Sequence, residues 1–176
     1  MNDIKRFNEL YESIVNSGHD ITVYHGDNFG TDHLNPKLMN NGNNQEGIGI
    51  YFSDSLSTAK SYGKNIIKAT INKSKLINAR KTIENIHNKG IINILKDMYK
   101  VDIESMFYLV TDYGVYLEEP EDLTLDNIEE LYNLMIDEEI RNFQITMAET
   151  FNVIDFVKSW NKHTDIDGTY FNKSFM

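Results

Sequence analysis

The order of hydrophobic and polar residues predicts a chain that mixes helices and strands. Apolar residues recur at helical spacing in four stretches, the second interrupted at Gly90, and we expect an amphipathic helix in each: residues 3–16, 80–100, 124–139 and 151–162. Runs rich in β-branched and aromatic residues predict six strands: residues 21–24, 48–52, 66–71, 75–77, 106–116 and 169–175. The two kinds of element do not alternate strictly, which favours an α+β fold over a doubly wound parallel sheet.

A short helix that ends in a tyrosine follows the second of these strands. Ser55 is placed to cap this helix, which we expect over residues 56–62, and Gly63 is placed to stop it. Tyr51 stands at the end of the strand, and Tyr62 stands in the last turn of the helix. A strand that runs into a helix folds back on itself, so the two rings can face each other across a slot. Such a slot suits a flat, electron-poor ring, and we interpret it as a site for the nicotinamide of NAD.

Three motifs give this part of the chain a family resemblance. They are Tyr-His-Gly at residues 24–26, Gly-Ile-Tyr-Phe-Ser-Asp at residues 49–54, and the pair Tyr51 and Tyr62, with ten residues between them. Together they resemble the ADP-ribosyltransferases of the diphtheria-toxin and poly(ADP-ribose) polymerase branch and their phage and bacterial relatives. The resemblance covers about residues 20 to 80.

The resemblance implies an ADP-ribosyltransferase-like fold, with split mixed or antiparallel β-sheets and peripheral helices. A chain of 176 residues has the length of one domain, so we expect a single such domain over residues 1–176. The middle, at about residues 82–150, matches no motif of the family and is expected to be an acidic insert. Residues 165–171 have a weaker likeness to the closing strand of small members.

The resemblance also assigns roles to individual residues. His25 would hydrogen-bond a ribose hydroxyl of NAD. The backbone of Gly26 would bind the nicotinamide carboxamide, because a residue without a side chain lets a ligand lie against the backbone. Tyr51 and Tyr62 would hold the nicotinamide between their rings, and Ser53, in the same strand-to-helix turn, would add a hydroxyl contact.

Many members of the family carry a glutamate late in the chain that binds the nicotinamide ribose and assists catalysis. Here the closing strand, residues 169–176, contains no acid. Asn172 is the polar residue that we expect nearest to that position, with Asp167 and Glu149 as alternatives. The missing glutamate argues against polymer synthesis, and it leaves both mono-ADP-ribosyl transfer and a catalytically inactive protein open.

The acidic charge of the chain bears on its partners. The formal net charge is −10, and no cluster of Lys and Arg suits a phosphate backbone, so a nucleic-acid partner is disfavoured. Residues 101–140 contain thirteen Asp and Glu and neither Lys nor Arg. Such a segment can be a solvated face that keeps the protein soluble, or it can dock a basic protein or imitate nucleic acid.

The chain lacks the sequence signatures of several other classes of protein. It has no cysteine, which excludes disulfides and thiol catalysis and fits a reducing cytoplasm. The five histidines do not fall at metal-binding spacing, so we expect no metal site. Residues 47–49 lack the third glycine of a dinucleotide fingerprint, and there is no Gly-x-Ser-x-Gly elbow. No stretch is apolar enough for a signal peptide or a membrane span.

These observations favour a mono-ADP-ribosyltransferase that uses NAD as co-substrate to modify a protein side chain. The acceptor is expected to be a protein with a basic surface. The Asn-rich, Ile-rich and cysteine-free composition resembles that of small phage or AT-rich bacterial proteins, so the expected setting is the cytoplasm of a host cell, where a host or defence protein could be the target. The alternatives are an inactive acidic binding protein on the same fold and an NAD glycohydrolase.

Overall fold

The computed structural model describes residues 20–28, 50–86, 88–166 and 168–170. These residues fall into two compact units. The first contains residues 20–28, 50–76 and 170, and the second contains residues 77–166, 168 and 169. Both units combine helices with strands, so the mixture of the two element types in an α+β fold is confirmed. The helix predicted over residues 3–16 lies outside the described residues, as do residues 171–175 of the last predicted strand.

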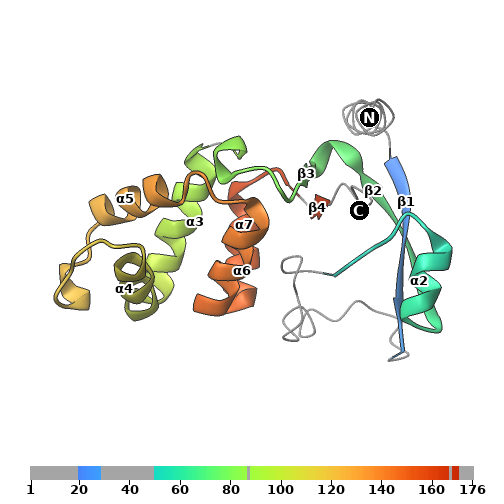
Figure 1. Ribbon diagram of the computed structural model, residues 1–176, viewed down its shortest axis with the longest axis horizontal. Coiled ribbons are helices and arrows are strands. Elements are labelled where there is room, and N and C mark those ends of the chain that lie inside the picture. Colours follow the sequence, from blue (N-terminus) through green and yellow to red (C-terminus); the bar gives the residue numbers. More distant parts are fainter. Residues whose placement is uncertain (1–19, 29–49, 87, 167, 171–176) are drawn as a thin grey trace, which may run out of the picture. The chain divides into compact units, whose positions relative to one another are not determined.

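The first unit is built on an antiparallel pair of strands. Strand β1, Asp20–Asp27, pairs along its whole length with β2, Asn65–Asn72, and Val23 lies opposite Ala69 (Figure 1). Val23 is buried, whereas Thr22 beside it is exposed, as expected for a strand that turns alternate side chains to opposite faces. The strands predicted at 21–24 and 66–71 are therefore confirmed, and each observed strand extends beyond both ends of the predicted one.

Helix α2, Leu56–Tyr62, has the bounds that the sequence predicts and precedes β2. The Ser55 hydroxyl caps it by accepting a hydrogen bond from the Thr58 amide at 3.3 Å. Its buried residue, Ala59, is 2% exposed. Gly63 ends the helix with extended backbone (φ −178°), a conformation that any residue can adopt. Glycine is needed there because a Cβ atom would collide with the backbone of Asp27.

The strand predicted over 48–52 is wrong for residues 50–52, which the structure describes as irregular. Only Ser53 pairs with the sheet, through two backbone hydrogen bonds of 2.7 and 2.8 Å with Tyr24. A ladder that continued from Ser53 and Tyr24 would next bond Tyr51 to the backbone of Gly26. The carbonyl oxygen of Tyr51 is bonded by the His25 side chain at 2.8 Å instead, which is the physical reason for the irregular backbone.

The second unit is mainly helical (Figure 1). Its helices are η3 (Ile83–Asn85), α3 (Asn88–Val101), α4 (Ile103–Asp112), η4 (Pro120–Asp122), α5 (Leu125–Met135), α6 (Ile140–Thr150) and α7 (Val153–His163). The short η2 (Lys73–Lys75) belongs to the first unit and precedes β3, Leu76–Asn78, which pairs with β4, Gly168–Tyr170. The core includes an aromatic group of Phe143, Phe156 and Trp160, with ring centroids 6.0–6.5 Å apart.

Two predictions in this unit are confirmed, one is confirmed in part and one is wrong. The helices expected at 124–139 and 151–162 are α5 and α7. The strand expected at 106–116 is instead mostly helix α4, because the Asp102 carboxylate caps the Ser105 amide at 3.0 Å and starts a helix there. Met106, Leu109 and Val110 then bury one face of it at helical spacing.

The helix expected over 80–100 begins only at Asn88, and Gly90 lies inside it without breaking it. A Cβ at Gly90 would come within 2.8 Å of the carbonyl oxygen of His163. This glycine therefore lets α3 approach α7 closely, which is a packing role that the periodicity of a single segment does not reveal.

Candidate functional site

The candidate site is built around the carboxyl end of β1. The His25 Nδ1 atom lies 2.8 Å from the carbonyl oxygen of Tyr51. Because a carbonyl can only accept, Nδ1 carries the hydrogen and Nε2 faces away from this bond. The His25 ring also lies 5.8 Å from the ring of Phe52. The structure therefore brings together His25 and the Tyr51 segment, which are 26 positions apart in the sequence.

The second tyrosine is tied to the same strand end by Asn28. The Asn28 side chain donates to the carbonyl oxygen of Tyr62 at 3.3 Å and accepts from the Lys64 amide at 3.2 Å. Neither tyrosine is a core residue, since Tyr51 is 42% exposed and Tyr62 is 71% exposed. Sequence reasoning missed Asn28, although an Asn directly after a strand is a common backbone-binding residue.

Gly26 has a structural role that differs from the one expected. A Cβ at Gly26 would lie 1.9 Å from the carbonyl oxygen of Ala59, so α2 packs directly on the backbone of β1. The glycine is thus required for the docking of α2. Its expected contact with the nicotinamide carboxamide stays a prediction.

Asp27 is a site residue that the sequence reasoning did not select. Its Oδ2 atom lies 3.8 Å from His25 Nε2, and its Oδ1 atom accepts a hydrogen bond from Asn65 Nδ2 at 3.3 Å. The side chains of His25 and Asp27 are 22% and 12% exposed. Residues i and i+2 of a strand share a face, and that signal in the His-Gly-Asp run could have revealed the pair.

The remaining predicted site residues are distributed differently. Ser53 lies beside Tyr24, and its hydroxyl is used as an acceptor for the Ser55 amide. Asn172 and Asp167 lie outside the described residues. Glu149 is an exposed residue of α6, so it belongs to the second unit and not to the unit that holds His25.

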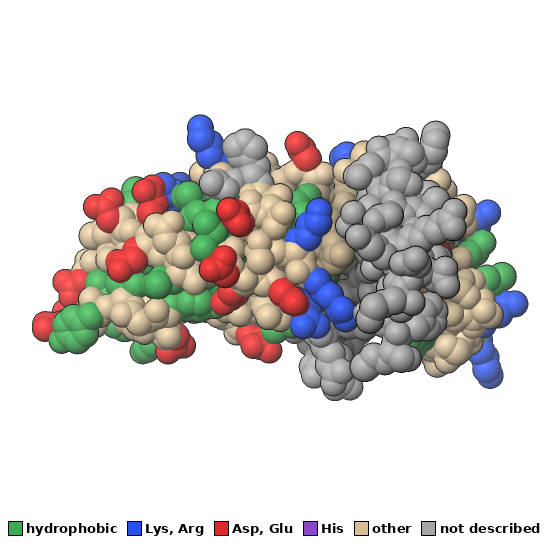
Figure 2. All heavy atoms as spheres, turned by 45° about the horizontal axis from the view of Figure 1, so that its top comes forward, with side chains coloured by type: hydrophobic (Ala, Val, Ile, Leu, Met, Phe, Trp, Pro, Cys, Tyr) green, Lys and Arg blue, Asp and Glu red, His purple; other side chains and the backbone are tan. Residues whose placement is uncertain are grey.

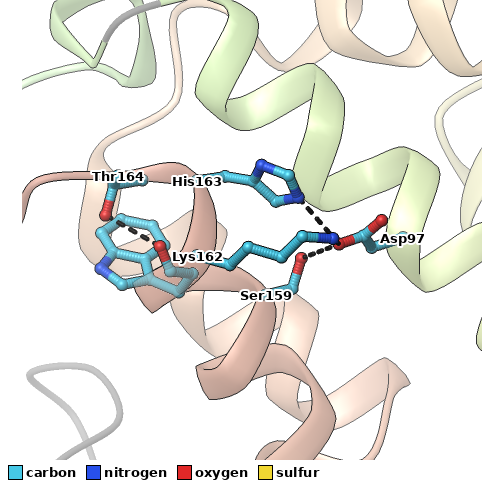
Figure 3. A network of polar contacts seen from close by, with 6 residues as sticks. Asp97, Ser159, Lys162, His163 and Thr164 are labelled. Carbon is cyan, nitrogen blue, oxygen red and sulfur yellow. Dashed lines mark hydrogen bonds and ion pairs between the residues drawn. The ribbon is translucent and has the colours of Figure 1, made fainter.

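A separate polar network lies between α3 and α7 (Figure 3). Three side chains of α7 converge on Oδ2 of Asp97: Ser159 Oγ at 3.2 Å, Lys162 Nζ at 2.9 Å and His163 Nε2 at 2.8 Å. Burial alone would raise the pKa of Asp97, but the hydrogen bonds from Lys162, His163 and Ser159 outweigh burial and lower the pKa to about 2. The network ties two helices together and does not form a nucleophile–base pair, because the serine hydroxyl points to the carboxylate and not to the imidazole.

The second unit presents an acidic surface. Among the acids between 101 and 140, ten are exposed: Glu104, Asp112, Glu118, Glu119, Glu121, Asp122, Asp126, Glu129, Glu130 and Asp137. Figure 2 shows acidic side chains spread over the visible face of this unit. Glu129 forms an ion pair with Lys96 at 2.7 Å. The exposed aromatic residues Tyr108 and Tyr116 lie among these acids in the sequence.

Comparison of the chain with protein families, with curated proteins and with solved structures gives no match. The candidate function therefore has to be argued from the residues themselves. Within 20–28, 50–86, 88–166 and 168–170, no group of three or more His, Asp and Glu side chains is placed to hold a metal ion. In the same part of the chain, every helix is too short or too polar to cross a membrane.

Proposed function

We propose that this protein is a mono-ADP-ribosyltransferase with an ADP-ribosyltransferase-like arrangement of sheets and helices, and that it transfers ADP-ribose from NAD to a protein side chain. The observation that carries the proposal is the attachment of two exposed tyrosines to one strand end. The His25 ring holds the backbone of Tyr51, and the Asn28 side chain holds the backbone of Tyr62.

One backbone bridge, between Ser53 and Tyr24, holds the segment before α2 against β1. Helix α2 packs on the backbone of β1 where Ala59 meets Gly26. The proposal requires the rings of Tyr51 and Tyr62 to face each other beside this contact, which is the arrangement that a slot for nicotinamide needs.

The proposed reaction needs a site that orients NAD and the acceptor more than it needs a side chain that donates a proton. In the proposed reaction the bond between the nicotinamide nitrogen and the ribose carbon breaks, and its electron pair leaves with the neutral nicotinamide. The acceptor atom forms a bond to the same carbon from the opposite face and loses its proton to solvent. Two aromatic rings that fix the nicotinamide, and an imidazole that anchors the backbone of Tyr51, supply orientation, which can account for a large part of such a barrier.

The acidic surface of the second unit supports a basic protein as the acceptor. The ten exposed carboxylates attract Lys- and Arg-rich surfaces and repel phosphate backbones. Because exposed charges are screened by salt, transfer to such an acceptor is expected to weaken as the ionic strength rises.

The test is to incubate the full chain with labelled NAD and a cell lysate and to measure both free nicotinamide and labelled protein. We expect release and labelling with the wild type and their loss in His25→Ala, Tyr51→Ala and Tyr62→Ala. For the release of nicotinamide, which does not depend on docking of the acceptor, the matched controls are Tyr108→Ala and Tyr116→Ala, which remove tyrosines of the second unit that are 58% and 84% exposed.

Each other outcome has a definite meaning. Release of nicotinamide without labelled protein indicates an NAD glycohydrolase. If NAD neither binds to the protein nor is cleaved, the proposed function is wrong, and binding of a basic protein by the same preparation would then support the inactive binding protein.

A further inference from the structure

We propose that the outer face of helix α4 binds arginine side chains of a partner protein, with one guanidinium stacked on the ring of Tyr108 and the carboxylates of Glu104 and Asp112 as its ion-pair partners. We call these three residues the α4 face. It lies in the second unit, and the inference goes beyond the proposed function, because binding at this face requires no reaction of NAD.

The α4 face follows from the spacing of residues along the helix. Glu104, Tyr108 and Asp112 are four positions apart, so their side chains follow one another along the same side of α4. All three residues are exposed. The opposite side of the helix packs into the core through three buried residues, Met106, Leu109 and Val110. The exposed side therefore places an aromatic ring one helical turn from a carboxylate in each direction.

The ring of Tyr108 is both accessible and oriented. Tyr108 is 58% exposed. Its ring meets that of Phe107 at an angle of 70°, with the centroids 5.5 Å apart, and Phe107 packs against the core. This contact holds the tyrosine ring against a fixed neighbour. A guanidinium can stack on such a ring, because the face of an aromatic ring carries partial negative charge.

The two carboxylates of the α4 face have no cation of their own. Among the described residues, neither Glu104 nor Asp112 forms an ion pair. Lys100, the nearest basic residue along the chain, is exposed at the end of α3 and is paired with neither of them. The face therefore carries negative charge on both sides of the ring, which a cation of another molecule would neutralise.

Arginine fits this face better than lysine, because its planar guanidinium stacks on aromatic rings and pairs with a carboxylate through two parallel hydrogen bonds. Val101 and Ile103, next to the face at the start of α4, are exposed apolar residues. A partner segment with an apolar residue beside its arginines therefore gains a contact that free arginine lacks. A second copy of the chain is disfavoured, since its net charge of −10 would meet like charge.

The experiment measures by fluorescence anisotropy the affinity of the full chain for a labelled synthetic peptide of alternating Arg and Leu. Tyr108→Ala should weaken binding roughly threefold, and Tyr108→Phe should bind like the wild type, since it keeps the ring face. The double variant Glu104→Gln, Asp112→Asn should weaken binding about fivefold. The same peptide with Lys in place of Arg should bind the wild type roughly threefold more weakly.

The matched control is the double variant Asp126→Asn, Glu130→Gln. It removes the same two charges from exposed residues of α5 that are also four positions apart, and it should weaken binding about twofold at most. The fluorescence of Trp160, a buried residue of the same unit, shows whether each variant is folded.

Equal losses in the two double variants, unchanged binding in Tyr108→Ala, or equal affinities for the two peptides would each overturn the inference, because net charge alone would then hold the peptide. A dimer in sedimentation that Tyr108→Ala dissociates would also overturn it and assign the face to a second copy. Failure of the wild type to bind the peptide overturns the inference but leaves the proposed function standing, because the release of nicotinamide needs no partner. Absence of NAD cleavage overturns the proposed function and leaves peptide binding at the α4 face unaffected.

Discussion

The carbonyl oxygen of Ala59 lies 1.9 Å from the position that a Cβ on Gly26 would occupy, so helix α2 rests on bare backbone of strand β1. A second close approach has the same character, since a Cβ on Gly63 would lie 2.0 Å from the carbonyl oxygen of Asp27. Neither neighbour is a flexible side chain that could move aside. The position of α2, and with it that of Tyr62, therefore depends on two glycines.

Gly26→Ala should displace α2 and abolish NAD binding, because a backbone carbonyl cannot yield by the distance that the methyl group needs. The second unit should stay folded. Its integrity can be followed separately, since Trp160, the single tryptophan of the chain, lies in that unit and is 6% exposed. The measurement pairs nucleotide binding by calorimetry with tryptophan fluorescence.

Gly114→Ala is the matched control for this variant. Gly114 has φ +95° and open space around its Cα, so alanine there costs about 1 kcal/mol of backbone strain and leaves NAD binding intact. Wild-type affinity for NAD in Gly26→Ala would contradict the packing role assigned to this glycine.

The tyrosine rings should act through their faces and not through their hydroxyls. We expect Tyr51→Phe and Tyr62→Phe to bind NAD nearly as well as the wild type, and each alanine variant to bind roughly tenfold more weakly, since a stacking surface is lost. Tyr116→Phe and Tyr116→Ala are the controls in the second unit. A loss of affinity in the phenylalanine variants equal to that in the alanine variants would show that the hydroxyls, and not the rings, hold the ligand.

Asp97 should make the second unit sensitive to acid. Its pKa in the folded protein is about 2, below the ordinary value of 3.8, so the ion pairs with α7 stabilise the fold above pH 4 and are lost as the pH falls through 2. The shift corresponds to at most about 2 kcal/mol, because the carboxylate is partly exposed and Lys162 largely so.

Asp97→Asn should lower the free energy of unfolding at pH 7 and remove most of its dependence on pH between 4 and 2. Urea unfolding followed by the fluorescence of Trp160, which neighbours Ser159 in the network, measures both effects. A variant that is less stable at pH 7 but keeps the full acid dependence would assign that dependence to other carboxylates.

The elements that the sequence predicts well are those whose signal is local. Helix α5 has its capping residue Thr124 and its apolar stripe in one continuous segment, and β1 has a plain β-branched run. Helix α4 was mistaken for a strand because Phe107, Tyr108 and Val110 favour strands by composition. The cap at Asp102 and the burial of one helical face decide the outcome, and burial depends on partners elsewhere in the chain.

The same distinction applies to the candidate site. The pairing of His25 with the Tyr51 segment could be expected from motif order, and the structure contains it. Asn28 was missed because its partners lie 34 and 36 positions away, in a segment whose register no local pattern specifies. Asp27 has one partner, Asn65, at 38 positions, but its other partner, His25, is two positions away on the same strand, so a local pattern could have revealed it. The packing role of Gly26 could not be told from the expected ligand contact, because a glycine that admits a helix and a glycine that admits a ligand look alike in a sequence.

Tyr113 and Glu138 form a half-buried pair in the second unit. The Tyr113 hydroxyl donates to Oε1 of Glu138, while Oε2 is buried without a hydrogen-bond partner among the described residues. Burial, and then the contact with Glu138, raise the pKa of Tyr113, so the phenol stays protonated and remains a donor at neutral and moderately alkaline pH. The phenol is therefore the donor that holds Oε1 of this half-buried carboxylate.

Tyr113→Phe should destabilise the second unit by about 1–3 kcal/mol, because it leaves a buried carboxylate without its donor. Glu138→Gln in the same background should recover part of that loss, since a neutral amide is less costly to bury than a carboxylate. Urea unfolding of the wild type, both single variants and the double variant forms a cycle that isolates the pair. Strictly additive effects would mean that the two side chains contribute independently and that the hydrogen bond between them adds nothing to stability.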